Sequence, residues 1–456
     1  MSKKPDFCFI VKPTNDCNLN CEYCFDRESR MKRLGKRLSL EDIDKIAKMG
    51  SEYAETVNWV WHGGECTVMG KEYFEKAQDA FVKYYDTTFS QTMQTNGIII
   101  SEDTSWIPFL DDLGISFGIS YDLAGQKLRD SKDRDLLKNI TSVSCRCGYI
   151  TVVTRENSDK LLEMYKRAQK EFGKGHSMSF NLGFEFRNQE PALDLSTFKD
   201  SLEEYFEYWL YDTTVDVLKE RLALTLIRGL SGYMKNPFCG STNCLGYWIS
   251  VFGNGDLFTC DREMENYKLG NLKDFNNIDE VWESEAYKRL SKHVNERYEK
   301  YCNKCPYLGR LNCRCVSNHT NANSTGLANE IDKRTCEKHV MCLNVAYNVL
   351  QRMDSIDILN VYAYETIHSD ILFTPKEITE FLKSKGLEFE LFVPVEILHK
   401  GMLHTTKQYE VFQIFNPVRM SKLPYNIEET TRNNMLQAIY EMHEDKIKNI
   451  IERGEC

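Results

Sequence analysis

The sequence lacks a long hydrophobic run, an excess of positive charge and any low-complexity tract. Its first apolar run, Phe7–Val11, is too short for the apolar part of a signal peptide, and no later run approaches a membrane span. The formal net charge of -10 argues against a general nucleic-acid-binding or acidic-membrane-binding surface, although local basic patches are compatible with it. We therefore expect a cytoplasmic protein that binds neither nucleic acid nor membrane.

What the chain does have is length and cysteine. Its 456 residues are enough for two or three domains with large buried cores. It contains 17 cysteines, which in a large cytoplasmic protein indicate metal or redox use rather than disulfides. The count is odd and most of the cysteines fall in two groups, so a disulfide framework is disfavoured.

The first 195 residues alternate short apolar runs with amphipathic stretches. One amphipathic stretch, Leu40–Met49, follows Ser39 as an expected N-cap, with Asp42 placed for a capping box. Repeated strand–helix alternation predicts a parallel sheet in an α/β fold, either curled or open. The expected strands are residues 7–12, 57–62, 92–95, 115–121, 149–153 and 179–184.

Beyond residue 195 the character of the chain changes twice. We expect residues 196–238 to form a helical connector that includes a helix at Val215–Ile227. Residues 239–342 hold nine cysteines among Gly, Asn and Asp, and such a segment is expected to need bound metal in order to fold. Residues 343–456 have ordinary composition again and predict a small α+β region.

Cys17, Cys21 and Cys24 follow the first expected strand with the spacing C-x3-C-x2-C. Three thiolates on one loop can hold three irons of a cubane cluster and leave the fourth iron open, as a reactive cluster requires. A structural zinc site would want four ligands. The alternatives are a zinc site completed by a distant residue, or buried free cysteines.

This loop resembles the signature of the radical S-adenosylmethionine (SAM) superfamily. The resemblance implies a partial (β/α)6 TIM-type barrel at residues 1–195, and a [4Fe-4S] cluster whose open iron is chelated by SAM. The reduced cluster would cleave SAM to a 5′-deoxyadenosyl radical that removes a hydrogen atom from the substrate. A flavodoxin- or ferredoxin-type electron donor is also implied. Tyr23 and Phe25 match the family's adenine-site aromatics, although either could simply be packing.

The segment Gly63, Gly64 and Glu65 follows the second expected strand and matches the family's GGE motif. In the family these glycines let the backbone approach the methionyl amine closely. The family usually has Pro at the next position, where this chain has Cys66. We interpret Cys66 as a tolerated substitution rather than a catalytic thiol.

Later turns supply further matches to the family's cofactor site. Asn96 lies in a turn that resembles the family's TNG turn, and Ser120 matches a position that hydrogen-bonds the cofactor carboxylate. Arg134 resembles the family arginine that pairs with that carboxylate, as a guanidinium fork can. Arg129 competes for this role, and the alternative for Arg134 is a solvated surface arginine.

The second cysteine group resembles the SPASM domain of peptide-modifying radical enzymes, and Gly255–Cys260 fits its G-x4-C element. The resemblance implies two auxiliary [4Fe-4S] clusters, and so three clusters in all. Cys313 is shifted from the family spacing, and Cys342 competes for the second set. The alternative is one or two zinc sites. The implied ligand sets are Cys239, Cys244, Cys260 and Cys315 for one cluster, and Cys302, Cys305, Cys313 and Cys336 for the other.

Asp261 directly follows Cys260. In the related anaerobic sulfatase-maturating enzymes, the matching Asp is a proposed base that deprotonates the substrate side chain, so we assign Asp261 as the candidate catalytic residue. The alternatives are an ion pair with Arg262 or a turn-forming Asp.

The expected reaction is oxidative, because auxiliary clusters suit a reaction that removes electrons. Our leading hypothesis is maturation of a ribosomally synthesised peptide by oxidation or by thioether or C–C crosslinking. The second is sulfatase maturation, which converts Cys or Ser to formylglycine. Residues 343–456 mildly favour the first, as a peptide-recognition module, although they could simply cover the SPASM domain. A third hypothesis, a three-cluster electron carrier without catalysis, is opposed by the GGE motif and the open-site spacing.

Overall fold

In the computed structural model the described residues are 3–124, 129, 147–172, 177–182, 193–211, 219–223, 225–226, 245–261, 267–302 and 333–352. Within them the strands are β1 (Lys4–Val11), β2 (Ala54–Trp61), β3 (Thr88–Thr95), β4 (Ile115–Ser120), β5 (Gly148–Val153), β6 (Ser177–Leu182), β7 (Lys219–Glu220), β8 (Trp248–Val251), β9 (Asp256–Phe258) and β10 (Lys268–Asn271). The α-helices are α1 (Arg27–Lys32), α2 (Leu40–Tyr53), α3 (Lys71–Lys83), α4 (Ile98–Glu102), α5 (Trp106–Asp112), α7 (Leu161–Phe172), α8 (Leu195–Tyr211), α10 (Ile278–Glu283), α11 (Glu285–Arg297) and α12 (Lys333–Arg352).

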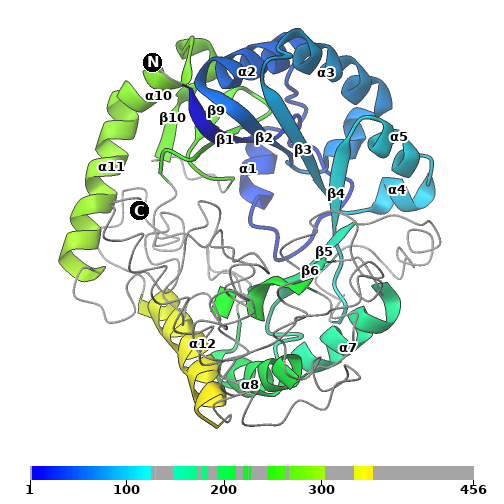
Figure 1. The fold of residues 1–456 in the computed structure, drawn as a ribbon, viewed down its shortest axis with the longest axis vertical. Helices are drawn as coiled ribbons and strands as arrows, with labels where there is room; N and C mark the ends of the chain where they lie inside the picture. Colours follow the sequence, from blue (N-terminus) through cyan, green and yellow to red (C-terminus); the bar gives the residue numbers. More distant parts are fainter. Residues whose placement is uncertain are drawn as a thin grey trace, which may run out of the picture.

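Strands β1 to β7 lie side by side in chain order, and each pairs in parallel with the next. Helices α2, α3 and α5 lie outside strands β1–β4, and α7 and α8 lie outside the later strands, whereas α1 lies on the inner side of the curve (Figure 1). This arrangement confirms the predicted parallel sheet and partial barrel. Because the carboxyl ends of parallel strands share one edge, the loops that follow β1–β4 meet there.

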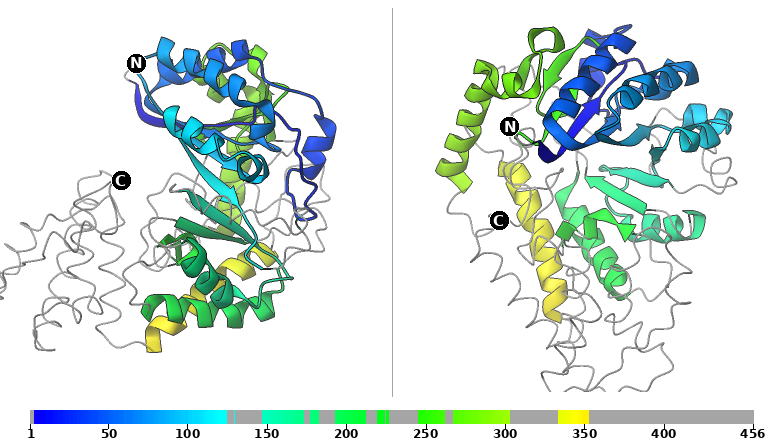
Figure 2. Two further views of the ribbon diagram at one scale, coloured as in Figure 1. Left: turned by 90° about the vertical axis from the view of Figure 1, so that its right-hand side faces the viewer. Right: turned by 45° about the horizontal axis from the view of Figure 1, so that its top comes forward.

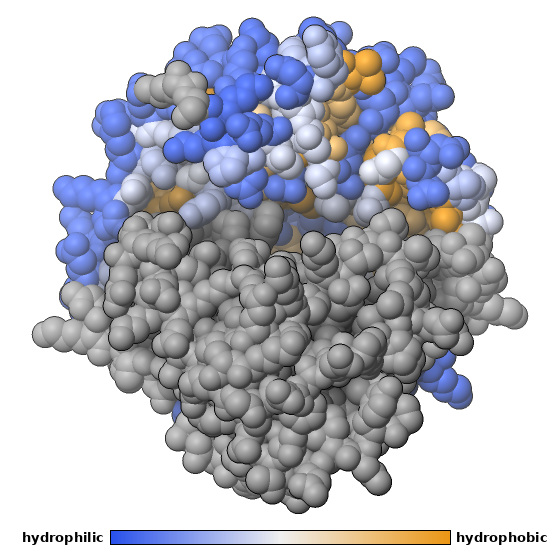
Figure 3. Space-filling model, viewed as in Figure 1, coloured by the Kyte–Doolittle hydropathy of each residue, from blue (hydrophilic) through white to orange (hydrophobic). Residues whose placement is uncertain are grey.

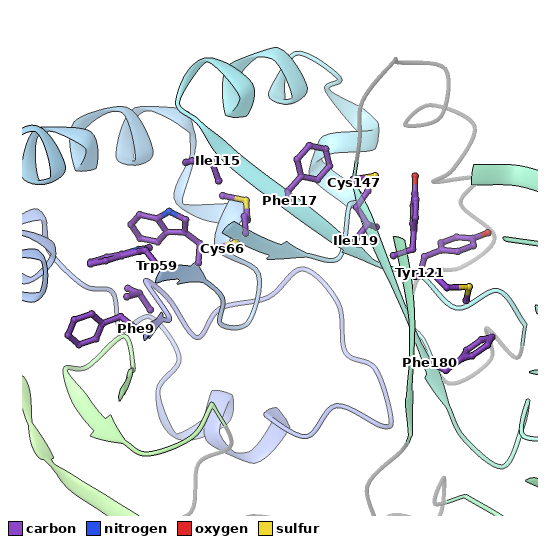
Figure 4. Packing of buried hydrophobic residues seen from close by; sticks show 14 of the residues in the cluster. Phe9, Trp59, Cys66, Ile115, Phe117, Ile119, Tyr121, Cys147 and Phe180 are labelled. Atoms are coloured by element: carbon purple, nitrogen blue, oxygen red, sulfur yellow. The ribbon is translucent and has the colours of Figure 1, made fainter. Parts of the chain in front are cut away.

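An aromatic core between the sheet and its helices makes this edge rigid. Trp59 and Trp61 alternate along β2 and are fully buried. Phe74 and Phe81 lie seven residues apart on α3, two turns on one face, and pack edge-on against them at 5.3 Å and 4.9 Å between ring centroids. Figure 4 shows this part of the core around Phe9 and Trp59, with its continuation through the inner strands.

The predicted capping box at the start of α2 is confirmed. The Ser39 hydroxyl accepts a hydrogen bond from the Asp42 amide at 3.1 Å, and the Asp42 carboxylate accepts one from the Ser39 amide at 2.9 Å. The helix runs four residues past its predicted end at Met49, to Tyr53.

The second cysteine region (residues 239–342) is joined to the barrel through the sheet itself. Strand β8 pairs in parallel with β1, from Cys8 opposite Trp248 to Val11 opposite Val251. Strands β9 and β10 then continue the same sheet as antiparallel neighbours. The turn after β8 therefore lies at the same edge as the loop after β1.

The predicted helix at residues 215–227 is wrong at residues 219–220, which form β7 and pair with Ser177 and Met178 of β6. The buried Glu220 carboxylate accepts hydrogen bonds from the Phe180 and Ala223 amides at 2.9 Å and 2.8 Å, and so ends the strand and starts the next turn. Sequence periodicity cannot detect this pairing because the partner strand lies about 40 residues away.

The expected boundary between residues 342 and 343 falls inside a helix. Helix α12 runs unbroken from Lys333 to Arg352 and packs against α8 (Figure 2). The amphipathic pattern of α12 continues across the expected boundary, which rests on cysteine content and not on helical periodicity. The rest of the expected α+β region, residues 353–456, lies outside the described residues.

Among the described residues no helix is long and apolar enough to cross a membrane. On the face shown in Figure 3, the described surface is mainly hydrophilic, with small separate apolar areas.

Candidate active site

Cys17, Cys21 and Cys24 lie on the loop between β1 and α1, at the edge where the barrel loops meet, and none is in a disulfide. The Leu19 amide lies 3.4 Å from Cys17 Sγ, and burial is the main reason that the pKa of Cys17 is raised to about 11. Burial likewise raises the pKa of Cys24. The thiols of Cys17 and Cys24 are therefore protonated when no metal is bound, and metal binding would have to displace their protons.

Two donors outside the motif point at these sulfurs. Asn96 Nδ2 lies 3.9 Å from Cys17 Sγ, and Arg30 Nη1 lies 4.0 Å from Cys24 Sγ. Hydrogen bonds and positive charge stabilise thiolates and iron-bound sulfur. Among the described residues, no three His, Cys, Asp or Glu side chains are arranged to hold a single metal ion. The donors of Asn96 and Arg30 suit a cluster held by sulfur ligands on this loop.

Arg30 is a site residue that the sequence reasoning missed. It lies on α1 six residues after Cys24, is 7% exposed, and its Nη2 donates to the Leu19 carbonyl at 3.1 Å. The available signal was an arginine one turn into the helix that follows the cysteine loop.

Gly63 and Gly64 pack directly against the chain that leads into Cys17. A Cβ atom at Gly64 would lie 2.2 Å from the Asp16 carbonyl oxygen, and one at Gly63 would lie 2.4 Å from the Thr14 carbonyl oxygen. The Gly64 amide donates to the Thr14 carbonyl at 3.2 Å. Gly63 also has a φ of 127°, which disfavours other residues. The two glycines thus fix the cysteine loop against the loop after β2.

The Glu65 carboxylate is a buried acceptor that joins its own loop, after β2, to the turn after β3. Its Oε1 accepts hydrogen bonds from the Thr67 amide, the Thr67 hydroxyl and the Thr95 hydroxyl, at 3.1, 2.6 and 2.8 Å. Its Oε2 accepts one from the Asn96 amide at 2.7 Å. Glu65 is 1% exposed, so these bonds hold the turn after β3 in place and thereby place the Asn96 side chain beside Cys17.

We expect Glu65→Gln to lower the free energy of unfolding by about 2–3 kcal/mol, because one amide N–H₂ group must face donors in either orientation. Thermal unfolding of the metal-free chain measures this effect. Glu72→Gln is the control, because the Glu72 carboxylate is exposed and pairs only with Lys76 on the surface of α3. Equal stability of Glu65→Gln and wild type would contradict the role of this carboxylate.

Asn96 and Ser120 come to the same edge from neighbouring strands. Asn96 Nδ2 also donates to Asn18 Oδ1 at 2.7 Å, which ties the turn after β3 to the cysteine loop. The Ser120 hydroxyl, at the end of β4, accepts from Gln94 Nε2 at 2.9 Å.

Tyr23 is held by a buried polar group at the end of β4. Its hydroxyl donates to Asp122 Oδ2 at 2.6 Å and accepts from Arg129 Nη1 at 3.0 Å. Burial, and then the negative charge of Asp122, raise the pKa of Tyr23, so the phenol is protonated. Arg129 is therefore part of the site that Tyr23 enters, whereas Arg134 lies outside the described residues.

Phe25 lies next to His62, with 6.4 Å between ring centroids, and the ammonium of Lys12 lies 5.6 Å from the Phe25 ring. The Gly63 amide donates to His62 Nδ1 at 2.8 Å. Burial is the main reason that the pKa of His62 is lowered, and the charge of Lys12 adds to it. His62 is therefore a neutral residue beside Phe25.

The extra cysteine after the GGE motif, Cys66, is fully buried, and its thiol donates to the Gln94 carbonyl at 3.6 Å. Burial raises its pKa well above the usual value. A buried, protonated thiol fits packing rather than catalysis.

Of the second cysteine group, side chains are described only for Cys260 and Cys342. Cys342 lies in the hydrophobic core on α12, where burial raises its pKa to about 12. Cys302 and Cys336 lie at the end of a short π-helix (Tyr298–Cys302) and on α12, and only their backbones are described. The remaining expected ligands, Cys239, Cys244, Cys305, Cys313 and Cys315, lie outside the described residues.

Asp261 reaches the cysteine loop of the barrel although 237 positions separate it from Cys24 in the chain. Lys12 Nζ donates a hydrogen bond to the Asp261 carbonyl oxygen and also pairs with Asp26, at 3.1 Å from Oδ2. The Asp261 carboxylate oxygen Oδ1 lies 3.2 Å from Cys260 Sγ. The residue after Cys260 is thus held beside the loop that carries Cys17, Cys21 and Cys24. Its expected alternative partner, Arg262, lies outside the described residues.

Two family models match this chain: the radical SAM superfamily over residues 11–184 and an iron–sulfur cluster-binding domain, SPASM, over residues 239–306. The cysteine-type anaerobic sulfatase-maturating enzyme of Clostridium perfringens is 24% identical over 67% of this chain and 87% of its own length. The serine-type anaerobic sulfatase-maturating enzyme of Bacteroides thetaiotaomicron is 22% identical over 70% and 84% of the two chains.

Solved structures share the fold. The structure titled native anSMEcpe with bound AdoMet and Cp18Cys peptide aligns with a TM-score of 0.61 at 22% identity, over 76% of this chain and 98% of that one. Streptococcus suis SuiB bound to S-adenosylmethionine aligns with a TM-score of 0.51 at 15% identity, over 74% and 78%.

Proposed function

We propose that this chain, a radical SAM enzyme with a SPASM domain, oxidises a cysteine or serine side chain in a peptide or protein substrate. The curated relatives named above, which are sulfatase-maturating enzymes, support this choice over crosslinking. When bound, SAM and the iron–sulfur clusters would supply the hydrogen-abstracting radical and the acceptor for the second electron.

The residues around the cysteine loop would divide the work of cofactor binding. Cys17, Cys21 and Cys24 would hold the first cluster, with Arg30 and Asn96 donating to its sulfurs. Residues at the surrounding loop ends would frame SAM, namely Tyr23, Phe25, Gly63, Gly64, Ser120 and either Arg129 or Arg134. Glu65 would act indirectly, because its carboxylate is already filled by protein donors.

The auxiliary clusters would use the second cysteine group. Cys260, with Cys239, Cys244 and Cys315, would hold one of them. Cys302, Cys305, Cys313 and Cys336 would hold the other, giving three [4Fe-4S] clusters in all. A flavodoxin- or ferredoxin-type protein would be the electron donor.

The observation that carries the proposed function is the position of Asp261. A general base must lie within reach of the proton that it removes. The backbone of Asp261 is bonded to Lys12 at the end of β1, directly before the segment that leads into the cysteine loop. A carboxylate there could take the thiol or hydroxyl proton of a substrate whose Cβ hydrogen faces SAM.

A second candidate is oxidative crosslinking of a ribosomally synthesised peptide. Its support is the fold shared with SuiB, which also matches in the form titled as bound to precursor peptide SuiA, at a TM-score of 0.50. Residues 343–456 would then be a candidate peptide-recognition segment.

The test uses the reconstituted full chain with SAM, a reductant and three matched sulfatase-type peptides that carry Cys, Ser or Ala at one position. We expect the Cys or Ser peptide to gain an aldehyde, detected by mass and by a hydrazide label, and the Ala peptide to stay unchanged. Loss of two hydrogens without hydrazide labelling would favour crosslinking instead. No product from any peptide, together with normal 5′-deoxyadenosine formation, would reject this substrate class.

Asp261→Asn should lower product formation by about 100-fold or more while 5′-deoxyadenosine is still formed, because a general base contributes about 10²–10⁴ to rate. Liquid chromatography of 5′-deoxyadenosine and modified peptide from the same reaction measures both. The control is Asp279→Asn, which removes a carboxylate in the first turn of α10. Wild-type product formation by Asp261→Asn would remove Asp261 from the catalytic assignment.

A further inference from the structure

Lys12 is a buried cation at the junction of the barrel and the second cysteine region. It follows β1 directly and is 0% exposed. A buried ammonium is costly unless it is paired and hydrogen-bonded, so its partners must repay its burial. Its side chain lies over the Phe252 ring, with Nζ 4.1 Å from the centroid, and this aromatic face covers the charge from one side.

The two polar partners of Lys12 come from the two cysteine groups. Asp26, two residues after Cys24, accepts from Nζ at 3.1 Å and is itself 2% exposed. The other oxygen of Asp26, Oδ1, has no hydrogen-bond partner among the described residues. The second acceptor is the backbone carbonyl of Asp261, which follows Cys260. The Lys12 side chain therefore links the loop that carries Cys17, Cys21 and Cys24 to Asp261, the proposed base.

Lys12 contacts the backbone carbonyl of Asp261 rather than its carboxylate. Lys12 bonds the carbonyl of Asp261, so it fixes the backbone of that residue while its positive charge is paired with Asp26. An ammonium has three donors and can hold both partners at once. The position of the Asp261 backbone is then fixed in part by a residue of the barrel, and not by the second cysteine region alone.

A second buried ion pair joins the same two regions without touching Asp261. Arg33, directly after α1, pairs with Asp256 of β9 at 2.9 Å and lies over the same Phe252 ring at 5.2 Å. This pair offers a matched control, because it shares the interface, the burial and the aromatic neighbour of the Lys12–Asp26 pair.

We propose that Lys12 is a positioning residue that holds Asp261 in register with the Cys17–Cys24 loop. The placement of Asp261 follows from the contacts alone, whereas its consequence for product formation rests on the proposed function. Removing Lys12 should leave the ligands of the first cluster in place but let the Asp261 segment move away from it.

The test variant is Lys12→Met with Asp26→Asn, because Lys12→Met alone would leave Asp26 as an unpaired buried carboxylate and could unfold the chain. The reconstituted full chain is compared with wild type by hydrogen–deuterium exchange of residues 257–261, and by product formed per 5′-deoxyadenosine. We expect faster exchange in this segment and a fall of at least about tenfold in the product ratio, because a displacement of about 1 Å can cost 10²-fold in rate.

The control variant is Arg33→Met with Asp256→Asn. We expect a lower melting temperature but a product ratio within about twofold of wild type, since this pair does not touch Asp261. An equal fall in the product ratio in both variants would overturn the proposal, because general docking of the two regions would then explain it. Unchanged exchange at residues 257–261 in the Lys12 variant would also overturn it, even if no peptide tested is a substrate.

Discussion

Replacing Cys17, Cys21 and Cys24 together with alanine should remove about four of the roughly twelve irons that the three proposed clusters would hold, and abolish 5′-deoxyadenosine formation. The auxiliary cysteines are untouched, so the remaining iron should stay bound. The loss of activity should be complete rather than partial, because all three proposed ligands of the first cluster are removed and the nearby Cys8 and Cys66 are buried. Iron analysis and chromatography of 5′-deoxyadenosine measure the two effects.

The matched control changes two cysteines that lie close by but inside the core. Cys8→Ala with Cys66→Ala removes two buried, protonated thiols whose pKa values are raised chiefly by burial. We expect this variant to keep about twelve irons and its 5′-deoxyadenosine formation. If it lost the first cluster, Cys66 would have a role at the cofactor that its buried position does not indicate. If the triple variant kept twelve irons, these three cysteines would not be the cluster ligands.

Gly64→Ala should lower 5′-deoxyadenosine formation by about 100-fold or more, through the position of the cysteine loop rather than through any lost ligand. The added methyl group would lie 2.2 Å from the Asp16 carbonyl oxygen and 2.5 Å from that of Asn15. Both obstacles are backbone atoms, and Asp16 is bonded covalently to Cys17. The clash can be relieved only by moving the first ligand of the cluster.

The measurement is the iron content and the 5′-deoxyadenosine yield of Gly64→Ala beside those of Gly70→Ala. Gly70 has a φ of 81° and a ψ of 159° but open space around it, so alanine there costs about 1–3 kcal/mol of backbone strain and no clash. We expect Gly70→Ala to keep its cluster and its activity. A Gly64→Ala variant that behaves like Gly70→Ala would show that the loop can yield without moving Cys17.

Much of the site could be predicted because its signals are local. Cys17, Cys21, Cys24 and Phe25 lie within nine consecutive residues, so their spacing can be read directly from the sequence. The capping box of Ser39 and Asp42 spans four residues, and helical periodicity is read in windows of about 11–18 residues. The helix predicted across Lys219 and Glu220 failed for the opposite reason, since the partner strand that converts them to β7 is remote.

The residues that the sequence analysis missed are those whose role depends on distant neighbours. Lys12 reads as an ordinary lysine after a strand, yet its acceptor at Asp261 is 249 residues away. Arg30 has no motif, and its contact with Cys24 arises only when α1 folds back along the loop. Glu65 was expected at the cofactor, but what the sequence did not indicate is that Thr95 and Asn96, about 30 residues away, help to fill its carboxylate.

The sequence by itself determined the predicted ligand chemistry, namely three candidate thiol ligands, their spacing and the glycine motif that follows them. Ligand type and short-range spacing are set by covalent order. Only the tertiary structure decided how the two cysteine regions meet. The parallel pairing of β8 with β1 brings Asp261 to the edge that carries Cys24, and it encloses Lys12 between them. No local pattern specifies that pairing, because its free energy comes from burial and backbone hydrogen bonds between segments more than 230 residues apart.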